Sequence, residues 1–255
     1  MIQPTLLFGA LLSILAAGIY YYVGRVLSRR HLSSPDSRMA WSLFVVWWYA
    51  LAATTVSGGL LSLLGGFGIV GLPLFTTFTM VNLLAICVGL FGLVYYLLYL
   101  FTGNRGLLGP LSVFYVAYYI LLIYYVLASD PAGVAVERWR ATLLYEHELR
   151  GPLFIIVLLL LLFPQIIGSL AYFTLFFRVN NATQKYRILL VSWSIIIWFL
   201  TGFIASISGL TDVDWWQIAN RMIGLSAALA ILLAYQPTTS IKRRFGITSI
   251  TEELA

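Results

Sequence analysis

The sequence has little charge, a single cysteine and only two histidines. Asp, Glu, Lys and Arg make up 9% of the 255 residues, against 61% hydrophobic residues, and the mean hydropathy is +0.95. A chain of this composition cannot stay dissolved in water as a compact domain, because too much apolar surface would remain exposed. The scarcity of charge therefore excludes a water-soluble domain and makes the bilayer the solvent of this chain.

Cysteine and histidine chemistry is restricted as well. Because Cys87 is the only cysteine, the sequence excludes an intramolecular disulfide and a metal site built from cysteines. His31 and His147 are expected on opposite sides of the membrane, which excludes a shared haem or metal site. We expect neither a metal nor a cofactor. The less favoured alternative is an external cation site that lacks a recognisable ligand spacing and consists of Glu146, His147, Glu148, Asp212 and Asp214.

Long apolar runs dominate the chain. Seven stretches of about 20 residues or more can cross the roughly 30 Å hydrocarbon core as helices. They predict an all-α integral membrane protein with a seven-transmembrane-helix bundle over residues 1–235 and a basic tail over 236–255. The predicted helices are Thr5 to Gly24, Ala40 to Leu63, Leu72 to Phe101, Pro110 to Ala128, Leu153 to Phe177, Arg187 to Gly209 and Trp215 to Tyr235.

The basic residues predict the orientation of these helices. Seven spans leave only Arg138, Arg140, Arg150 and Arg221 on one side. The other side carries the remaining eleven of the fifteen basic residues, which are Arg25, Arg29, Arg30, Arg38, Arg105, Arg178, Lys185, Arg187, Lys242, Arg243 and Arg244. The positive-inside rule assigns this richer side to the cytoplasm. We therefore expect a multi-pass cell-membrane protein with its N-terminus outside, its C-terminus in the cytoplasm, lipids as partners and no nucleic-acid partner.

The longest external loop, Ser129 to Gly151, carries an amphipathic pattern. Val136, Trp139 and Leu143 recur at helical spacing, which predicts a short helix lying on the outer surface. Glu146 and Arg150 would form an i,i+4 pair on it, and Trp139 would anchor it at headgroup level. A connector is the favoured interpretation, and a lid over a ligand is the alternative.

Small residues recur four positions apart along several predicted helices, a spacing that lets helix backbones approach closely. The sets are Gly9, Ser13 and Ala17, then Ala50, Thr54 and Gly58, then Gly202 and Ser206, and finally Gly224 and Ala228. They predict intramolecular helix packing.

Charged side chains are rare within the predicted membrane spans. An ion or proton pathway usually needs ionisable groups there, and none lies near the middle of a span. The seventh segment has no lysine, which excludes a retinal Schiff base. A nucleophile and base, or paired acids, cannot be placed at a common depth, so we do not expect an enzyme.

Four residues remain as candidates for ligand binding. Asn82 and Gln165 either form interhelical hydrogen bonds or line a pocket, and Pro164 frees a backbone carbonyl beside Gln165. Trp48 lies in the middle third of its helix, where a large aromatic side chain either packs or borders a hydrophobic pocket. Arg221 lies about two turns into the last helix, where it either snorkels outward and pairs with Asp214 or binds a ligand under the external loop.

Part of the chain resembles a known family. The segment with Arg29, Arg30, His31, Pro35, Arg38 to Ala40, Phe44 and Trp47 to Leu51 is similar to the first cytoplasmic loop and second helix of the seven-helix sensory regions of bacterial histidine kinases. Pro237 to Phe245 resembles the basic turn that follows the last helix in that family. The likeness covers about a fifth of the chain and implies a membrane input region without kinase activity, since no phosphoacceptor histidine or nucleotide motif is present.

These observations lead to three functional hypotheses. The first is a non-enzymatic seven-helix receptor or sensor that perceives a lipophilic ligand or a membrane state and acts on a cytoplasmic signalling partner through the segment after the last helix. The second is a structural or accessory subunit of a larger membrane complex. The third is a carrier of an uncharged small molecule.

Overall fold

The computed structural model describes residues 3–30, 34–146, 152–207, 213–250 and 252, with side-chain detail except at 152–162, 165 and 198–207. A helix forms at each of the seven predicted places, and every one except the second agrees with its predicted start or end within two residues. The second, predicted from Ala40 to Leu63, begins five residues earlier and ends three residues later. The elements are α1 (Pro4–Ser28), α2 (Pro35–Gly66), α3 (Leu72–Thr102), η1 (Arg105–Leu107), α4 (Leu108–Ala128), β1 (Pro131–Val136), β2 (Ala141–Tyr145), α5 (Pro152–Arg178), α6 (Ala182–Ile207), α7 (Asp214–Tyr235) and α8 (Thr239–Phe245).

Local sequence explains where several helices begin and end. Proline occupies the first turn of α1, α2 and α3, where its missing N–H leaves no hydrogen bond unmade. Gly103 ends α3 in the left-handed conformation, at φ 65°, which glycine adopts without strain. Among the described residues, five helical segments are long and apolar enough to cross a membrane: α1, α2, α3, α7 and the segment Arg105–Ala128.

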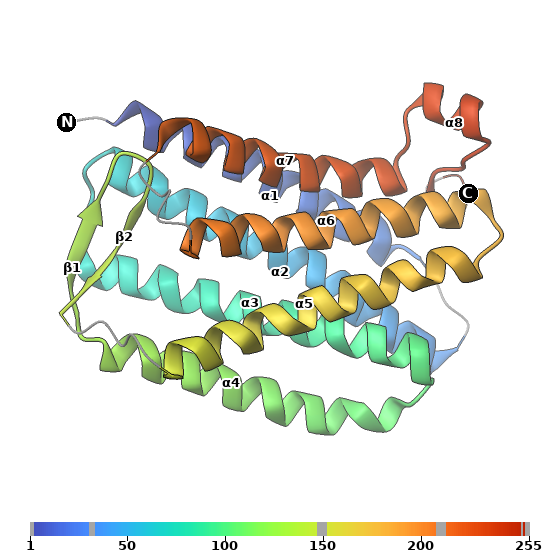
Figure 1. Ribbon diagram of the computed structural model, residues 1–255, viewed down its shortest axis with the longest axis horizontal. Helices are drawn as coiled ribbons and strands as arrows, with labels where there is room; N and C mark the ends of the chain where they lie inside the picture. The colour runs from blue at the N-terminus through green and yellow to red at the C-terminus, as the bar shows by residue number, and fades with distance from the viewer. Residues whose placement is uncertain (1–2, 31–33, 147–151, 208–212, 251, 253–255) are drawn as a thin grey trace.

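The long helices run alternately up and down and meet side by side (Figure 1). Each helix in the order α1, α2, α3, α5, α6, α7 contacts the next, and α7 contacts α1, so these six helices form a closed ring. Helix α4 packs outside the ring against α3. The core of the bundle is strongly aromatic, with Tyr20, Phe44, Trp47, Trp48 and Tyr95 almost fully buried. Loops at one end of the bundle carry β1 and β2, and the other end carries α8, so we name these the hairpin end and the tail end.

The prediction of an amphipathic helix between Ser129 and Gly151 is wrong, because the described part of this loop forms an antiparallel β-hairpin. Val136 pairs with Ala141 and Val134 with Leu143. Val134, Val136 and Thr142 are β-branched, and the burial of β2 alternates, with Ala141 and Leu143 inward. Hydrogen bonds from Arg140 lower the pKa of the Glu137 carboxylate in the turn. Arg150, the expected partner of Glu146, lies outside the described residues.

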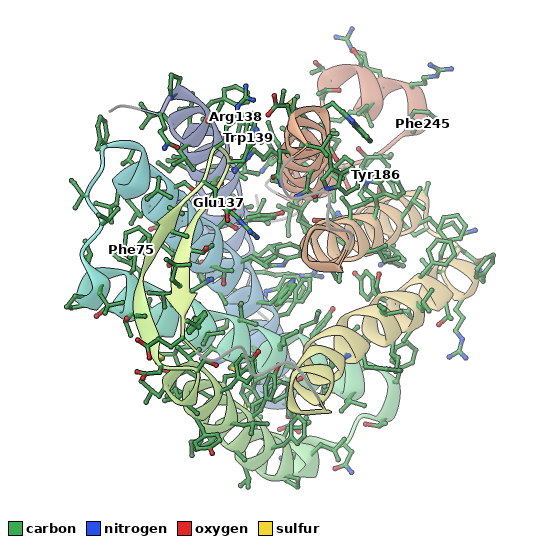
Figure 2. All side chains as sticks on the ribbon, turned by 60° about the vertical axis from the view of Figure 1, so that its left-hand side comes forward. Phe75, Glu137, Arg138, Trp139, Tyr186 and Phe245 are labelled. Carbon is green, nitrogen blue, oxygen red and sulfur yellow. The ribbon has the colours of Figure 1, made fainter. Side chains whose placement is uncertain are left out.

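The hairpin covers one end of the bundle with a small core of its own. Phe75 is completely buried there with Ala141 and Leu143, and side chains such as Leu61 and Leu64 pack around them. Figure 2 shows Phe75 beside the strands and Trp139 at the hairpin tip. The loop is therefore a packed cap on the helix ends.

The predicted tail also folds onto the bundle. After α7 the chain forms α8, which carries Lys242, Arg243 and Arg244, and then returns toward the helices. Ile250 is 1% exposed and belongs to the main core of the bundle. The segment after the last long helix is thus in direct contact with the helical bundle.

Candidate functional site: a cavity at the tail end

A cavity of about 490 Å³ opens at the tail end of the bundle. Its size lies within the range of about 300 to 1,000 Å³ that small-molecule sites occupy. We call it the inner cavity. The residues that line it come from six of the seven long helices or the loops beside them and from the tail: Arg30, Trp41, Tyr96, Leu100, Tyr172, Leu175, Asn181, Thr183, Gln184, Arg187, Ile188, Tyr235 and Thr248.

Arg187 is the buried charge of the inner cavity. Its exposure is only 9%, and it lies in the second turn of α6. One guanidinium nitrogen donates a hydrogen bond of 3.1 Å to the backbone carbonyl of Thr248, and the guanidinium carbon lies 5.8 Å from the ring centroid of Tyr235. Packing against an aromatic face stabilises a guanidinium in a position shielded from water.

A second arginine lines the same cavity from another part of the chain. Arg30 follows the end of α1, and its guanidinium carbon lies 5.0 Å from the ring centroid of Trp41. The indole of Trp41 is itself fixed, because its Nε1 donates a hydrogen bond of 3.0 Å to the carbonyl of Leu27. Arg30 is exposed, so the cavity has one buried arginine and one at its surface.

The start of α6 adds to the positive potential. Asn181 precedes the helix, and its side-chain oxygen accepts a hydrogen bond of 3.1 Å from the backbone N–H of Gln184. The N-terminal end of a helix carries a partial positive charge. Among the described lining residues there is no carboxylate. Two described acids near this end pair elsewhere: Asp36 with Arg105 at 3.1 Å, and Glu252 with Lys242 at 2.6 Å.

The tail forms one wall of the inner cavity. Besides accepting from Arg187, Thr248 donates its backbone N–H to the Thr183 hydroxyl at 3.4 Å. Hydrogen bonds from Lys242 and from Ser249 hold the pKa of the Glu252 carboxylate at about 2, so this turn of the tail is fixed by a charged group. The cavity is therefore shared between the bundle and the segment that follows it.

The predicted ligand residue Trp48 lies in the core between α1 and α2. It is 0% exposed, stacks on Tyr20 with a centroid separation of 6.1 Å and meets the edge of Phe44 at 5.6 Å. Its indole nitrogen has no hydrogen-bond partner. Trp48 is thus surrounded by other aromatic side chains and is not among the residues that line the inner cavity.

Arg221 lies at the hairpin end, under the loop as predicted. It donates a hydrogen bond to the backbone carbonyl of Trp139, and its guanidinium packs against Gly9 of α1. Asp214, its suggested partner, is instead bound by Arg138 at 2.8 Å and by the Trp139 indole at 2.6 Å. Figure 2 shows Arg138 and Trp139 at the hairpin tip, near the ends of α1 and α7. Arg221 therefore connects the hairpin to the bundle and also borders a smaller cavity of about 120 Å³.

Asn82 and Gln165 lie on α3 and α5. The side-chain oxygen of Asn82 is buried without a hydrogen-bond partner, and the side chain of Gln165 lies outside the described residues. Asn82, Arg221 and Trp48 do not come together at one described site. The described residues hold no cluster of three potential metal ligands, and His147, Glu148 and Asp212 of the alternative cation site lie outside them.

Sequence reasoning missed the inner cavity because it treated Arg30 and Arg187 as members of the basic collar. One signal was present: Arg187 is followed directly by an apolar run, so its side chain begins at the edge of a span. The contacts of Arg187 with Tyr235 and Thr248, and of Arg30 with Trp41, depend on tertiary structure and have no local pattern.

Comparison with known proteins gives no indication of the function. No family model matches the chain, and no curated protein matches it at a significant level.

Proposed function

We propose that the chain is a non-enzymatic seven-helix receptor or sensor of the cell membrane, with its N-terminus outside and its C-terminus in the cytoplasm. The five apolar helices of sufficient length and the concentration of Lys and Arg in the loops of the tail end support this topology. The remaining two spans of the proposal are α5 and α6, which are 27 and 26 residues long. Helices of this length exceed the roughly 20 residues that a bilayer requires.

One observation carries the proposal: the inner cavity is walled both by the bundle and by the tail. A ligand that enters it would touch Arg187 on α6 and, beside it, Thr248 of the tail. The two residues are joined by a hydrogen bond from the guanidinium to the Thr248 carbonyl. A ligand that accepts hydrogen bonds competes with this carbonyl for Arg187. Occupancy of the cavity is thereby coupled to release of the tail.

This coupling is a shift between two states. In one state the tail is docked, with Ile250 in the core and Thr248 bound to α6. A ligand with higher affinity for the released state increases the population of that state by the difference in affinity. The released tail, with the basic residues of α8 before it, would be the signal to a cytoplasmic partner.

Electron paramagnetic resonance distances between spin labels test the proposal. We would replace Cys87 by Ala and introduce Asn180→Cys, on the α5–α6 turn, and Arg243→Cys, on α8, both exposed positions outside the cavity lining. The expected result is a longer and broader distance distribution when lipid extracted from the native membrane is added. The control pair, Asn180→Cys and Thr102→Cys, lies at the same end without the tail and should not change. A lipid-independent distance for the first pair would refute the sensor.

An accessory subunit is the second candidate, favoured by the outward face of α4. Val113, Val116, Ile120, Tyr124 and Leu127 follow one another at helical spacing and are each 56–70% exposed. Such a face contacts either lipid or another apolar helix. Mass measurement after gentle release from the native membrane tests this candidate. A stoichiometric partner that is lost in a Val116→Lys/Ile120→Lys variant would favour it over the receptor.

A further inference from the structure

We propose that the inner cavity binds the phosphate group of an anionic amphiphile, which Arg187 and Arg30 hold while its apolar part lies along the cavity wall. This inference rests on the proposed function, because it names the class of ligand that the sensor would perceive. Trp48, Asn82 and Arg221, which were predicted from the sequence, do not line this site. The side chain of Gln165 lies outside the described residues.

The cationic groups of the cavity favour a ligand with several anionic oxygens. A planar guanidinium presents five N–H donors in a geometry that matches the oxygens of phosphate. Here two guanidiniums line one cavity, and the positive end of α6 opens onto it beside Thr183 and Gln184. A phosphate has enough charged oxygens to contact both arginines and the helix end together, whereas a carboxylate has only two.

Burial makes Arg187 the stronger of the two contacts. At 9% exposure its charge is largely shielded from water, so an ionic hydrogen bond to it is weakened less by solvent than one to an exposed side chain. Arg30 has a different position, since it also lines a neighbouring cavity of about 250 Å³ together with Trp41. It therefore lies between the two cavities.

The rest of the wall suits an amphiphile better than a fully hydrated anion. Leu100, Leu175 and Ile188 contribute aliphatic surface, and the rings of Trp41 and Tyr96 lie with them. The proposed topology puts this end of the bundle at the cytoplasmic membrane surface, where the phosphates of lipids are located and where basic residues attract anionic lipids. The cavity thus has a polar part at headgroup level and an apolar part beside it.

Native mass spectrometry of the full chain tests the ligand class. Detergent-solubilised protein would be titrated with dioleoyl phosphatidylglycerol, with dioleoyl phosphatidylcholine and, in a separate arm, with inorganic phosphate. The choline cation of the second lipid is repelled by the arginines, so the first lipid should bind more tightly. Both lipids carry the same phosphodiester anion, so the preference comes from the repulsion of the choline cation. We expect it to be about tenfold, because like charges about 10 Å apart in a partly shielded site repel by roughly that amount.

Three arginine variants separate the cavity from the general basic surface. Arg187→Gln and Arg30→Gln should bring the preference close to one, and Arg187→Lys should keep part of it. Arg178→Gln is the matched control, because it removes the same charge from an exposed residue at the same end that does not line the cavity. If Arg187→Gln does not elute as a folded protein, the exposed Arg30→Gln still decides the test.

The outcomes are distinct. Phosphatidylglycerol that binds more tightly than inorganic phosphate and is retained in its presence supports the amphiphile. Inorganic phosphate that binds as tightly as the lipid would show that the apolar part contributes nothing, and the amphiphile would be wrong. Equal binding of the two lipids with no binding of inorganic phosphate would overturn the phosphate site, as would an equal loss in Arg178→Gln. Because this measurement is of binding alone, tight binding with an unchanged spin-label distance would refute the sensor and keep the site. A distance that responds to lipid without charge preference would do the reverse.

Discussion

Gly92→Ala is expected to destabilise the bundle strongly, because α3 touches the backbone of α2 at this residue. A methyl group at position 92 would lie 2.3 Å from the carbonyl oxygen of Leu43 and 3.2 Å from its carbonyl carbon. Carbon and oxygen atoms of this kind normally approach to about 3.3–3.6 Å. The two helices would therefore have to separate by about 1 Å, since a backbone carbonyl within a helix cannot turn aside.

The same geometry limits the loss of stability that Gly92→Ala should cause. Forcing an extra methyl group into a packed interior typically costs about 1 to 3 kcal/mol, and a rigid neighbour places Gly92→Ala at the upper end. Gly224→Ala on α7 is the matched control, because nothing lies within 4 Å of the position its methyl group would take. There the better helix propensity of alanine should leave stability unchanged or raise it by up to about 1 kcal/mol.

Unfolding in mixed micelles, followed by circular dichroism as denaturing detergent is added, gives the two midpoints. The expected order is Gly224→Ala at or above the parent protein and Gly92→Ala well below it. Identical midpoints for the two variants would mean that α2 and α3 do not approach each other at Gly92, and the packing described here would be wrong.

Three further predictions follow from the two ends of the molecule. An impermeant maleimide should label Glu146→Cys on intact cells but Arg243→Cys only after permeabilisation, each in a Cys87→Ala background; the reverse pattern would contradict the orientation. Trp139→Ala should lower the free energy of unfolding by about 3 kcal/mol or more, because it removes a buried indole. Asp214→Asn should lower it by about 1 kcal/mol or less, since the ion pair of Asp214 is largely exposed. Thermal denaturation compares the two variants, and equal effects would exclude a packed hairpin. The pKa of Glu252 is lowered from 4.5 to about 2, so its contribution to tail docking should be complete at neutral pH and decline progressively as the pH falls from about 4.5 to 2. Spin-label distances measured against pH should show release in that window, and release near pH 6 would contradict this assignment.

The long helices were predictable because their cause is local. Each is an apolar run with few charges, and in lipid such a run must satisfy its own backbone hydrogen bonds. The hairpin was not predictable in the same way. Val136, Trp139 and Leu143 fit a helical period, yet Trp139 lies in the turn and Leu143 on β2, and the register is set by packing against Phe75 on a distant helix.

The small-residue patterns show the same limit. Gly9 and Ser13 do lie at helix contacts, against Arg221 and Gly59, but the predicted Gly58 and Gly224 have open space beside them. Spacing along the sequence fixes which residues share a helix face and leaves open which face meets a neighbour. Gly202 and Ser206 have no described side-chain environment. The close approach at Gly92 belongs to no such repeat and depends on how α2 crosses α3.

The candidate site depends even more on tertiary structure. Arg30 and Arg187 are separated by most of the chain, and only ring closure of the helices brings them to one cavity. The return of Thr248 to α6 is likewise a long-range contact. The sequence suggested that the segment after the last helix acts on a partner, which stays a prediction. The contact that joins this segment to the bundle could not be derived from any local pattern.

The most direct test of the account is the modification rate of Ser249→Cys in the Cys87→Ala background. Ser249 is 2% exposed beside the residue that closes the inner cavity, so a thiol there reacts only when the tail opens. In nanodiscs that contain phosphatidylglycerol the account predicts faster labelling than in phosphatidylcholine alone, and no such acceleration once Arg187→Gln is added. Equal labelling rates in the two lipids, for a protein that does bind phosphatidylglycerol, would show that a ligand in the cavity does not open the tail.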